Sequence, residues 1–481
     1  MSRPAPRSQE HAALIRRFEE AGQGQVFRFW PRLSDAERTR LAEEAAEIDL
    51  AEIARLDREV VQAPRAAAPI AADLSPAPWV ALPEEGGAPE EWAAATRAGE
   101  QALRDGRVAC FTVAGGQGTR LGYHGPKGLF PVTPVTGKSL FQVLAEKLRA
   151  AERVYRRELP WLILTSHVNH GATAAFFEAH GHFGLRREQV HLFRQGRMPA
   201  VDFAGRILLE APGRIALSPD GHGGSLRALA RSGALDRLER AGIDVISYVQ
   251  VDNPLVACVD PAFVGFHLLR GSEMSSRAVL KTLAGERVGV FCERGGALAV
   301  VEYSDLPGEL AALADPAGRL VYRLGSIAVH LLSTSFARRM AQGAAGALPF
   351  HRADKAIASV DDAGATREPD RPNGVKFEMF VFDALPFARN PIVVQARRDE
   401  TFSPVKNAAG ADSPESCRRD QMRLFARWMR AAAIPVAVDA DGVPSLRVEV
   451  SPLFAGDAES FAESWRRLSP KPALVDGLVL G

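Results

Sequence analysis

A glycine-rich segment carries the clearest chemistry in this sequence. Residues 114–122 are AGGQGTRLG and residues 126–128 are PKG, and both follow a short apolar run at 107–113. Glycine has no Cβ and tolerates positive φ, so such a backbone can lie closely against a phosphate group. Arg120 and Lys127 add positive charge to the same segment. The glycines alone would favour a tight strand-to-helix turn, but glycines, Arg and Lys together after a buried strand favour phosphate binding.

Two better-known phosphate motifs nearly match this part of the chain and fail. GxGxxG would need glycine at 121, where the chain has Leu121. Walker A would need glycine at 132, where the chain has Val132, although residues 137–139 (GKS) complete its second half. We therefore predict neither a dinucleotide site nor a P-loop, which disfavours a dinucleotide-dependent oxidoreductase.

An acidic side chain follows a second apolar run. Residues 245–251 (VISYVQV) are typical of a buried strand, and Asp252 and Asn253 come directly after it. A carboxylate at the end of a strand is well placed to hold Mg²⁺ against phosphate oxygens. On its own, the pair would favour a simple turn before Pro254 over a metal site. With the glycine-rich segment in the same chain, we predict the metal role for Asp252.

Strands that alternate with helices must position these residues. The pattern predicts helices over 9–22 and 34–46, the second with Ser34 as N-cap, and then an extended connector over 64–90. From residue 107 onward, apolar runs alternate with amphipathic segments, which predicts a doubly wound α/β sheet. Besides the two strands above, we expect strands at 159–166, 190–194, 277–282, 288–292 and 297–303, and helices at 140–157 and 172–184. Ligands of such folds bind at the carboxyl ends of the strands.

The chain divides into three predicted parts: a helical N-terminal region (1–100), an α/β domain that contains the glycine-rich segment (101–387) and a small C-terminal domain (388–481). A polar loop is expected at 361–374. The 481 residues are ample for a large core.

Charge and cysteine content exclude several classes of protein. Lys and Arg number 59 against 58 Asp and Glu, so the basic excess that long nucleic acids require is absent. The four cysteines are widely spaced, which disfavours zinc sites and disulfide frameworks. No apolar run is long enough for a membrane span, and the first twenty residues do not form a signal peptide. We expect a cytoplasmic protein that binds neither nucleic acid nor membrane.

The segment VAGGQGTRLGYHGPKG resembles the signature loop of the UTP-dependent sugar-1-phosphate uridylyltransferases, and most closely that of the eukaryotic UDP-N-acetylhexosamine pyrophosphorylases. Seven further segments resemble the same family in the same order across nearly the whole chain. They are AGQGQVFRFWPRL (21–33), QGRMPAVDFAGRILLE (195–210), SPDGHGGSLRAL (218–229), YVQVDNPLV (248–256), VVEYSDL (300–306), PNGVKFEMFVFD (372–383) and FSPVKN (402–407).

The resemblance implies a Rossmann-like, GT-A-like nucleotidyltransferase core that makes a UDP-sugar and pyrophosphate from UTP and a sugar 1-phosphate with Mg²⁺. It implies a monomer or weak homo-oligomer. The implied nucleotide-binding residues are Val113, Ala114, Gly115, Gly116, Lys127, Gln195, Gly221, Asp252 (also the metal ligand) and Lys376. The implied catalytic cations are Arg120, Lys127, Lys376 and Lys406. The implied sugar-binding residues are His222, Asn253, Gly289, Glu302, Tyr303, Ser326, Phe380 and Phe382.

Two residues depart from the family's N-acetylhexosamine pattern. His222 and Ser326 stand where that group usually has asparagine, and Gly-His-Gly is the form in the related UDP-glucose and broad UDP-sugar pyrophosphorylases. N-acetylglucosamine or N-acetylgalactosamine 1-phosphate is the predicted substrate, with glucose 1-phosphate or several sugars as the alternative. A non-catalytic sensor of UDP-sugars is a third hypothesis, which the retained cations disfavour.

Overall fold

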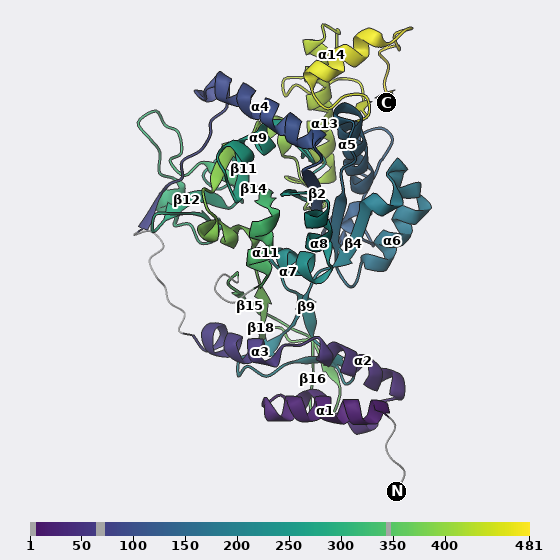
Figure 1. Cartoon of the computed structure of the whole chain (residues 1–481), viewed down its shortest axis with the longest axis vertical. Helices are drawn as coiled ribbons and strands as arrows, with labels where there is room; N and C mark the ends of the chain where they lie inside the picture. The colour runs from purple at the N-terminus through teal and green to yellow at the C-terminus, as the bar shows by residue number, and fades with distance from the viewer. Residues whose placement is uncertain (1–5, 64–72, 343–347) are drawn as a thin grey trace. The chain divides into compact units, whose positions relative to one another are not determined.

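The computed structural model describes residues 6–63, 73–342 and 348–481 (Figure 1). These residues form two compact units, each built from several stretches of chain. The N-terminal unit contains residues 6–63, 196–225 and 348–381, and the sheet unit contains 73–195, 226–342 and 382–481. The three predicted domains are contiguous instead, and that division stays a prediction.

A large mixed sheet forms the centre of the sheet unit, which confirms the α/β prediction at this level. Along the path β1-β12-β14-β10-β2-β3-β4, the strands from β10 to β4 are parallel and β14 runs antiparallel to β10. β11 pairs with β14 and β19, and β13 pairs with β12. The strands are β1 (Leu74–Pro76), β2 (Val108–Val113), β3 (Trp161–Thr165), β4 (Val190–Arg194), β10 (Val245–Gln250), β11 (Met274–Leu280), β12 (Val290–Arg294), β13 (Ala297–Val301), β14 (Leu324–Ser333) and β19 (Ile392–Gln395).

The four parallel strands end at one edge of the sheet. Gln250 pairs with Val113, Val113 with Leu164, and Thr165 with Arg194. Residues of β2 and β3 are buried throughout, as expected for parallel strands covered on both faces. The segments that follow these strands, which include the glycine-rich segment and Asp252, therefore emerge side by side.

Helices of the sheet unit pack around this sheet, and one pair is unusually close. Gly99 on α4 and Gly265 on α9 face the partner helix so closely that a Cβ on either would overlap its backbone. Figure 1 shows α4 and α9 lying together. The helices are α4 (Pro89–Arg104), α5 (Leu140–Tyr155), α6 (His170–Ala179), α8 (Ala234–Arg240), α9 (Pro261–Leu269), α10 (Gly308–Ala311), α11 (Thr334–Gln342), α12 (Arg398–Thr401), α13 (Pro414–Ala431) and α14 (Ala458–Arg467), with α7 (Gly224–Arg231) shared between the units.

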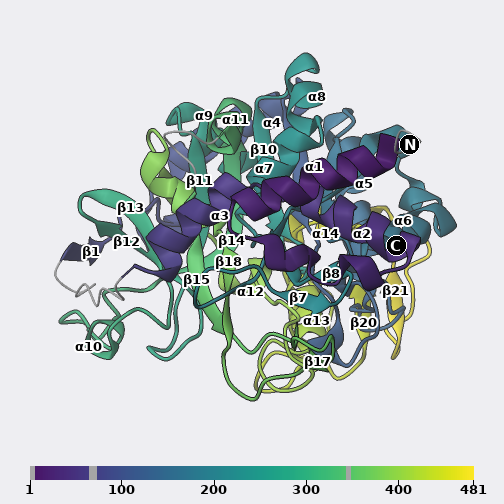
Figure 2. The ribbon, with the colours of Figure 1, turned by 90° about the horizontal axis from the view of Figure 1, so that it is seen from below.

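The N-terminal unit combines helices with short strands. Ser34 and Glu37 form the predicted capping box at the start of α2, and Glu44 on α2 accepts a hydrogen bond from the Ile215 N–H at 2.9 Å. Figure 2 looks onto α1, α2 and α3. The elements are α1 (Pro6–Glu20), α2 (Asp35–Ala46), α3 (Leu50–Leu56), β5 (Arg197–Pro199), β6 (Val201–Asp202), β7 (Leu209–Ala211), β8 (Arg214–Ile215), β9 (Leu217–Pro219), β15 (His351–Lys355), β16 (Ser359–Val360), β17 (Thr366–Arg367) and β18 (Gly374–Glu378).

Two sequence expectations differ from the structure. Residues 64–72 of the expected connector lie outside the described residues, but the remainder joins the sheet edge: β1 pairs with β12, and Val80 exchanges backbone hydrogen bonds with Val393 and Gln395. Main-chain pairing needs no apolar periodicity, so this edge left no signal in the sequence. Likewise, the loop expected at 361–374 includes β17, which forms a hairpin with β16.

The end of the chain has its own apolar cluster. Phe425, Trp428 and Phe461 from α13 and α14 pack with β20 (Val448–Val450) and β21 (Leu478–Leu480). β19, however, belongs to the large sheet, although the predicted C-terminal domain begins at 388. No helix in the described ranges is long and apolar enough to cross a membrane.

A buried histidine on α9 makes the stability of the fold depend on pH. Burial lowers the pKa of His267 from 6.5 to about 4, with Asp244 opposing the shift, and the ring nitrogen Nδ1 bonds Ser275 Oγ at 2.8 Å. The unfolded chain binds this proton near pH 6.5 and the folded chain only near pH 4, so stability falls as pH drops through that window. We expect His267 to lower the free energy of unfolding by on the order of 3 kcal/mol as the pH falls through this window. Denaturant unfolding of wild type and His267→Asn between pH 4 and 7 measures it; parallel pH curves would contradict the prediction.

Candidate active site

The glycine-rich segment forms a loop that folds back on itself after β2. Gly118 donates its N–H to the Gly125 carbonyl at 2.9 Å, and Lys127 donates its N–H to the Gly116 carbonyl at 3.1 Å. Lys127 therefore lies opposite Gly116, although the two are eleven positions apart in the sequence. The fold-back gathers the glycines and the lysine at the edge where the parallel strands end. Val113 and Ala114 are buried at the start of the loop.

A buried asparagine that sequence reasoning missed anchors this loop by hydrogen bonds to its backbone carbonyls. Asn169 Nδ2 donates to the carbonyls of Ala114 (2.9 Å) and Gly116 (3.3 Å), while its Oδ1 accepts from the Ser166 N–H at 2.7 Å. Its side chain is fully buried. With two loop carbonyls directed at Asn169, the N–H groups of Gly115 and Gly116 have no acceptor within the described residues. Free N–H groups in a glycine-rich loop are suitable donors to an anion.

Gln195 lies against the same loop. It follows β4, donates its backbone N–H to the Thr165 carbonyl at 2.8 Å and is almost completely buried. A Cβ added at Gly115 would overlap Gln195 Oε1. The structure thus brings together two predicted nucleotide contacts, and position 115 has to be glycine for Gln195 to keep its place. The predicted contact between Gln195 and the uracil ring stays a prediction.

A matched pair of glycine substitutions tests this arrangement. We expect Gly115→Ala to displace Gln195 and raise the KM for UTP about tenfold, the cost of losing one good contact. Gly171→Ala, on α6 and outside the predicted site, is the control, because a Cβ there meets no atom within 4 Å. Steady-state kinetics at varied UTP concentration provide the measurement. Equal KM values for the two variants would show that the Gln195 contact does not matter.

The predicted catalytic lysine and the predicted metal ligand are in direct contact. Lys127 Nζ lies 3.2 Å from Asp252 Oδ2, and both side chains are less than one-fifth exposed. Asp252 directly follows β10, and Lys127 closes the glycine-rich loop. An ammonium and a carboxylate with little exposure, at the strand ends and beside free loop N–H groups, suit a ligand that carries both phosphate and a divalent cation.

The donor set fits Mg²⁺ bound through phosphates. Among the described residues, no group of three or more His, Cys, Asp or Glu side chains could form a complete metal cage. Mg²⁺ commonly uses one or two carboxylates together with substrate phosphates and water, and Asp252 supplies one such carboxylate. The residues present therefore fit a metal that arrives with a nucleotide.

The other two predicted cations of the sheet unit are more exposed. Arg120 lies in a short 3₁₀ turn at Thr119–Leu121, is exposed and has no hydrogen-bond or ion-pair partner in the part of the chain described. Lys406 Nζ lies 4.0 Å from Asp412 Oδ2 and 5.5 Å from the Phe402 ring centre. The residue before it, Val405, donates its N–H to the Asp252 carbonyl at 2.9 Å. Lys406 is thus one residue from a direct backbone contact with Asp252.

Asn253, a predicted sugar contact, is engaged within the chain. Its Nδ2 donates to the Thr401 carbonyl at 2.7 Å, and its Oδ1 accepts from the N–H groups of Leu255 (3.2 Å) and Ser403 (3.1 Å). The buried amide therefore ties the turn after β10 to the segment that leads to Lys406. Its role toward the sugar stays a prediction.

Three predicted sugar residues converge elsewhere in the sheet unit. A Cβ at Gly289 would lie 3.3 Å from Glu302 Oε1, and the Ser326 N–H donates to the Gly289 carbonyl at 2.8 Å. Tyr303, beside Glu302, is about half exposed, whereas Phe382 is buried. The arrangement places a carboxylate and a hydroxyl beside a glycine backbone, which suits sugar hydroxyls.

The remaining predicted residues belong to the N-terminal unit. Residues 220–223 pair with 379–381: Gly223 donates to the Met379 carbonyl at 2.8 Å, and the Val381 N–H donates to His222 Nδ1 at 3.2 Å. The His222 ring stacks on Phe380, with centroids 5.3 Å apart. Gly221 has φ +80°, and a Cβ there would overlap the Met379 backbone. In a neutral His222 that accepts at Nδ1, the proton is on Nε2. Lys376 lies on β18, half-buried.

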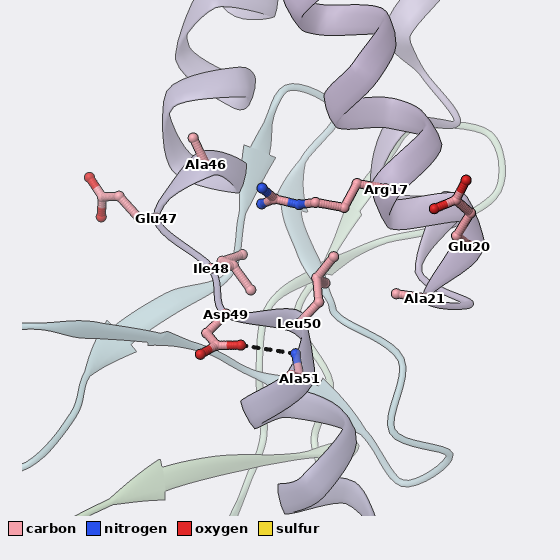
Figure 3. A pocket seen from close by; sticks show the side chains of 9 residues that line it. All are labelled: Arg17, Glu20, Ala21, Ala46, Glu47, Ile48, Asp49, Leu50 and Ala51. Carbon is pink, nitrogen blue, oxygen red and sulfur yellow. Dashed lines mark hydrogen bonds between the residues drawn. The ribbon is translucent and has the colours of Figure 1, made fainter. Parts of the chain in front are cut away.

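The N-terminal unit also has an open hollow of about 640 Å³ (Figure 3). Arg17 reaches into it from α1, and the Asp49 carboxylate beside it caps α3 at the Ala51 N–H. None of the predicted site residues lines it. The lining residues are Arg17, Glu20, Ala21, Ala46, Glu47, Ile48, Asp49, Leu50 and Ala51.

Comparison with known proteins adds independent evidence. Residues 88–416 match the model of a family described as UTP–glucose-1-phosphate uridylyltransferase. The chain is 37% identical to UDP-N-acetylhexosamine pyrophosphorylase-like protein 1 of Xenopus tropicalis, covering 92% of this chain and 91% of the relative. It is 34% identical to UDP-N-acetylglucosamine pyrophosphorylase of Saccharomyces cerevisiae, covering 95% of this chain and 98% of that relative. The crystal structure of the uridine diphosphate N-acetylglucosamine pyrophosphorylase of Trypanosoma brucei, 26% identical, superposes with a TM-score of 0.83 over 100% of this chain and 99% of that one.

Proposed function

We propose that this chain, which belongs to the UTP–glucose-1-phosphate uridylyltransferase family, makes a UDP-sugar and pyrophosphate from UTP and an N-acetylhexosamine 1-phosphate. The observation that carries the proposal is the Lys127–Asp252 pair, 3.2 Å apart beside the free N–H groups of the glycine-rich loop. A triphosphate substrate requires a cation, a metal ligand and hydrogen-bond donors to its phosphate oxygens, and the structure offers candidates for all three.

The reaction needs charge compensation more than acid–base chemistry. An oxygen of the sugar 1-phosphate attacks the α-phosphorus of UTP, and pyrophosphate leaves in line. The attacking phosphate is already ionised, so no general base is needed. Two unit charges 4 Å apart repel by ~4 kcal/mol at an effective dielectric constant of 20. Lys127 and Arg120 would offset this repulsion, and Lys376 and Lys406 are proposed to complete the set of cations.

Asp252 would hold Mg²⁺ together with phosphate oxygens. When bound, the metal would neutralise charge on the triphosphate and on the leaving pyrophosphate. Because Lys127 and Asp252 already contact each other, binding of a metal-loaded nucleotide would replace one ion pair by two, ammonium to phosphate and carboxylate to metal. We also propose that the catalytic core is of the GT-A-like type implied by the sequence.

Two sugars compete for the second substrate. The names of the curated relatives favour N-acetylglucosamine 1-phosphate. His222, stacked on Phe380, and Ser326, bonded to Gly289, favour glucose 1-phosphate because both replace the usual asparagine. We rank the N-acetylhexosamine first, since full-length relatives carry more weight than two positions.

A panel of sugar 1-phosphates tests the proposal. Purified protein, UTP and Mg²⁺ are combined with N-acetylglucosamine, N-acetylgalactosamine, glucose and galactose 1-phosphates, and pyrophosphate release is measured. We expect the highest kcat/KM with an N-acetylhexosamine. Release with glucose 1-phosphate alone would reverse the ranking of sugars. Release with none would favour the sensor. A Lys127→Ala preparation controls for contaminating enzymes.

His222→Asn tests the specificity assignment separately. Asparagine restores the usual family residue, so we expect the kcat/KM ratio of N-acetylglucosamine 1-phosphate to glucose 1-phosphate to rise about tenfold. His351→Asn is the matched control, because His351 stacks on the same Phe380 ring at 4.5 Å but is not a predicted sugar contact. An unchanged ratio in His222→Asn would show that His222 does not determine which sugar 1-phosphate is preferred.

Cellular setting and assembly are further proposals. We propose a cytoplasmic protein that acts as a monomer or weak homo-oligomer and binds no nucleic acid. The balanced charge supports the absence of nucleic-acid binding, and the four cysteines, all buried and free, support a reducing compartment.

A further inference from the structure

A lysine outside the predicted site bonds to the turn that follows Asp252. Lys147 lies on α5, and its Nζ donates to the carbonyls of Pro254 at 2.5 Å and Val256 at 2.7 Å. No carboxylate lies within ion-pair distance of this ammonium in the described ranges. Burial lowers the pKa of Lys147 to about 8. Lys147 is half-buried, and partial removal of an ammonium from water without a counter-ion is costly unless hydrogen bonds to the protein compensate for it.

The turn needs those hydrogen bonds. Leu255 and Val256 are buried, so their part of the backbone is removed from water. No other donor among the described residues reaches the carbonyls of Pro254 and Val256. An unsatisfied buried carbonyl costs about 1–3 kcal/mol. One lysine satisfies both, and thereby fixes the turn to α5.

The same turn connects two predicted site residues. Asp252 begins it and pairs with Lys127, while the Asp252 carbonyl accepts from Val405, the neighbour of Lys406. Asn253 secures its other side through Thr401 and Ser403. Movement of the turn would shift the Asp252 carboxylate and the chain leading to Lys406 together.

We infer that Lys147 is a positioning residue for uridylyl transfer, which holds the 252–256 turn so that Asp252 presents its carboxylate correctly to the metal-loaded nucleotide. The inference rests on the proposed function for its catalytic consequence. Its structural part, that Lys147 orders the turn, is independent of any activity.

Two substitutions of Lys147 and one control test it. Lys147→Met keeps an unbranched side chain only one atom shorter and removes its donors, whereas Lys147→Arg keeps a cation that can reach carbonyls. Lys138→Met is the matched control, because Lys138, just before α5, bonds the buried Glu146 carboxylate at 2.8 Å and does not touch the turn. Thermal unfolding shows which variants are folded. If Lys147→Met does not fold, Lys147→Gln, which keeps one donor, replaces it.

For Lys147→Met we expect about a tenfold lower kcat and a similarly higher Mg²⁺ concentration for half-maximal rate, as for the loss of other supports of metal ligands. The KM for the sugar 1-phosphate should stay within twofold, and Lys147→Arg should recover at least half of the loss. Wild-type-like kcat and Mg²⁺ dependence in Lys147→Met, or an equal loss in Lys138→Met, would overturn the inference.

Amide hydrogen exchange separates this inference from the proposed function. Without substrates, the amides of residues 252–258 should exchange at least about tenfold faster in Lys147→Met than in wild type and Lys138→Met. If wild type releases no pyrophosphate but exchange behaves in this way, the proposed function fails while Lys147 still orders the turn. Unchanged exchange would overturn the positioning role even in an active enzyme.

Discussion

We expect Lys127→Ala to lower kcat on the order of 10²-fold or more, the usual cost of removing one preorganised charge stabiliser. Lys127 lies at the fold-back of the glycine-rich loop, opposite Gly116, and its side chain is less than one-fifth exposed. A cation held there would already be oriented toward the phosphates of bound UTP, so it would need no reorganisation during the reaction. Initial rates of pyrophosphate release at saturating UTP and sugar 1-phosphate measure the effect.

Two further substitutions separate the charge of Lys127 from its shape and from the general effect of removing a partly buried lysine. Lys127→Arg keeps the charge but changes its shape, and should retain more activity than Lys127→Ala. Lys138→Met removes another mostly buried lysine, paired with Glu146, and should leave kcat within a few-fold. Near-normal turnover in Lys127→Ala would reject the catalytic role of this residue.

Asp252→Asn gives the second large effect. Asparagine keeps the size of the side chain and an oxygen for Lys127, but loses the charge that attracts a divalent cation. We expect kcat to fall on the order of 10²-fold, with a higher Mg²⁺ concentration needed for half-maximal rate. Rates measured across a wide range of Mg²⁺ concentration should show partial recovery at high Mg²⁺.

A matched acid at the opposite end of the same strand provides the control. Asp244 directly precedes β10 and forms an exposed pair with Arg107, whereas Asp252 directly follows β10. Asp244→Asn should therefore leave the Mg²⁺ dependence unchanged, because exposed ion pairs contribute little. If Asp252→Asn shows a wild-type Mg²⁺ response, Asp252 is not a metal ligand.

Patterns that depend on local chain geometry were predictable from the sequence. The strand before the glycine-rich segment is β2, Ser34 caps α2 as its spacing to Glu37 indicated, and Asp252 follows β10 as expected. Each follows from neighbouring residues alone: apolar runs, a capping box, or a polar residue at the end of a strand. The resemblance to a family supplied Gln195 and Gly289, which no local pattern would have identified.

The supports of the site were not predictable in this way. Asn169 reaches carbonyls 53 and 55 residues away, and Lys147 reaches carbonyls 107 and 109 residues away. Both bond to backbone oxygens, which every residue has, so the partner leaves no mark in the sequence. A polar residue in a mostly buried stretch was the available signal, and many such residues have no role in a site.

The most direct test of the account is a crystal structure of the protein with UTP and Mg²⁺. We predict that the triphosphate lies on the glycine-rich loop, with phosphate oxygens within hydrogen-bond distance of Lys127 and Mg²⁺ bound by the Asp252 carboxylate. A nucleotide bound elsewhere, with Lys127 Nζ still 3.2 Å from Asp252 Oδ2, would contradict the proposed roles of these two residues.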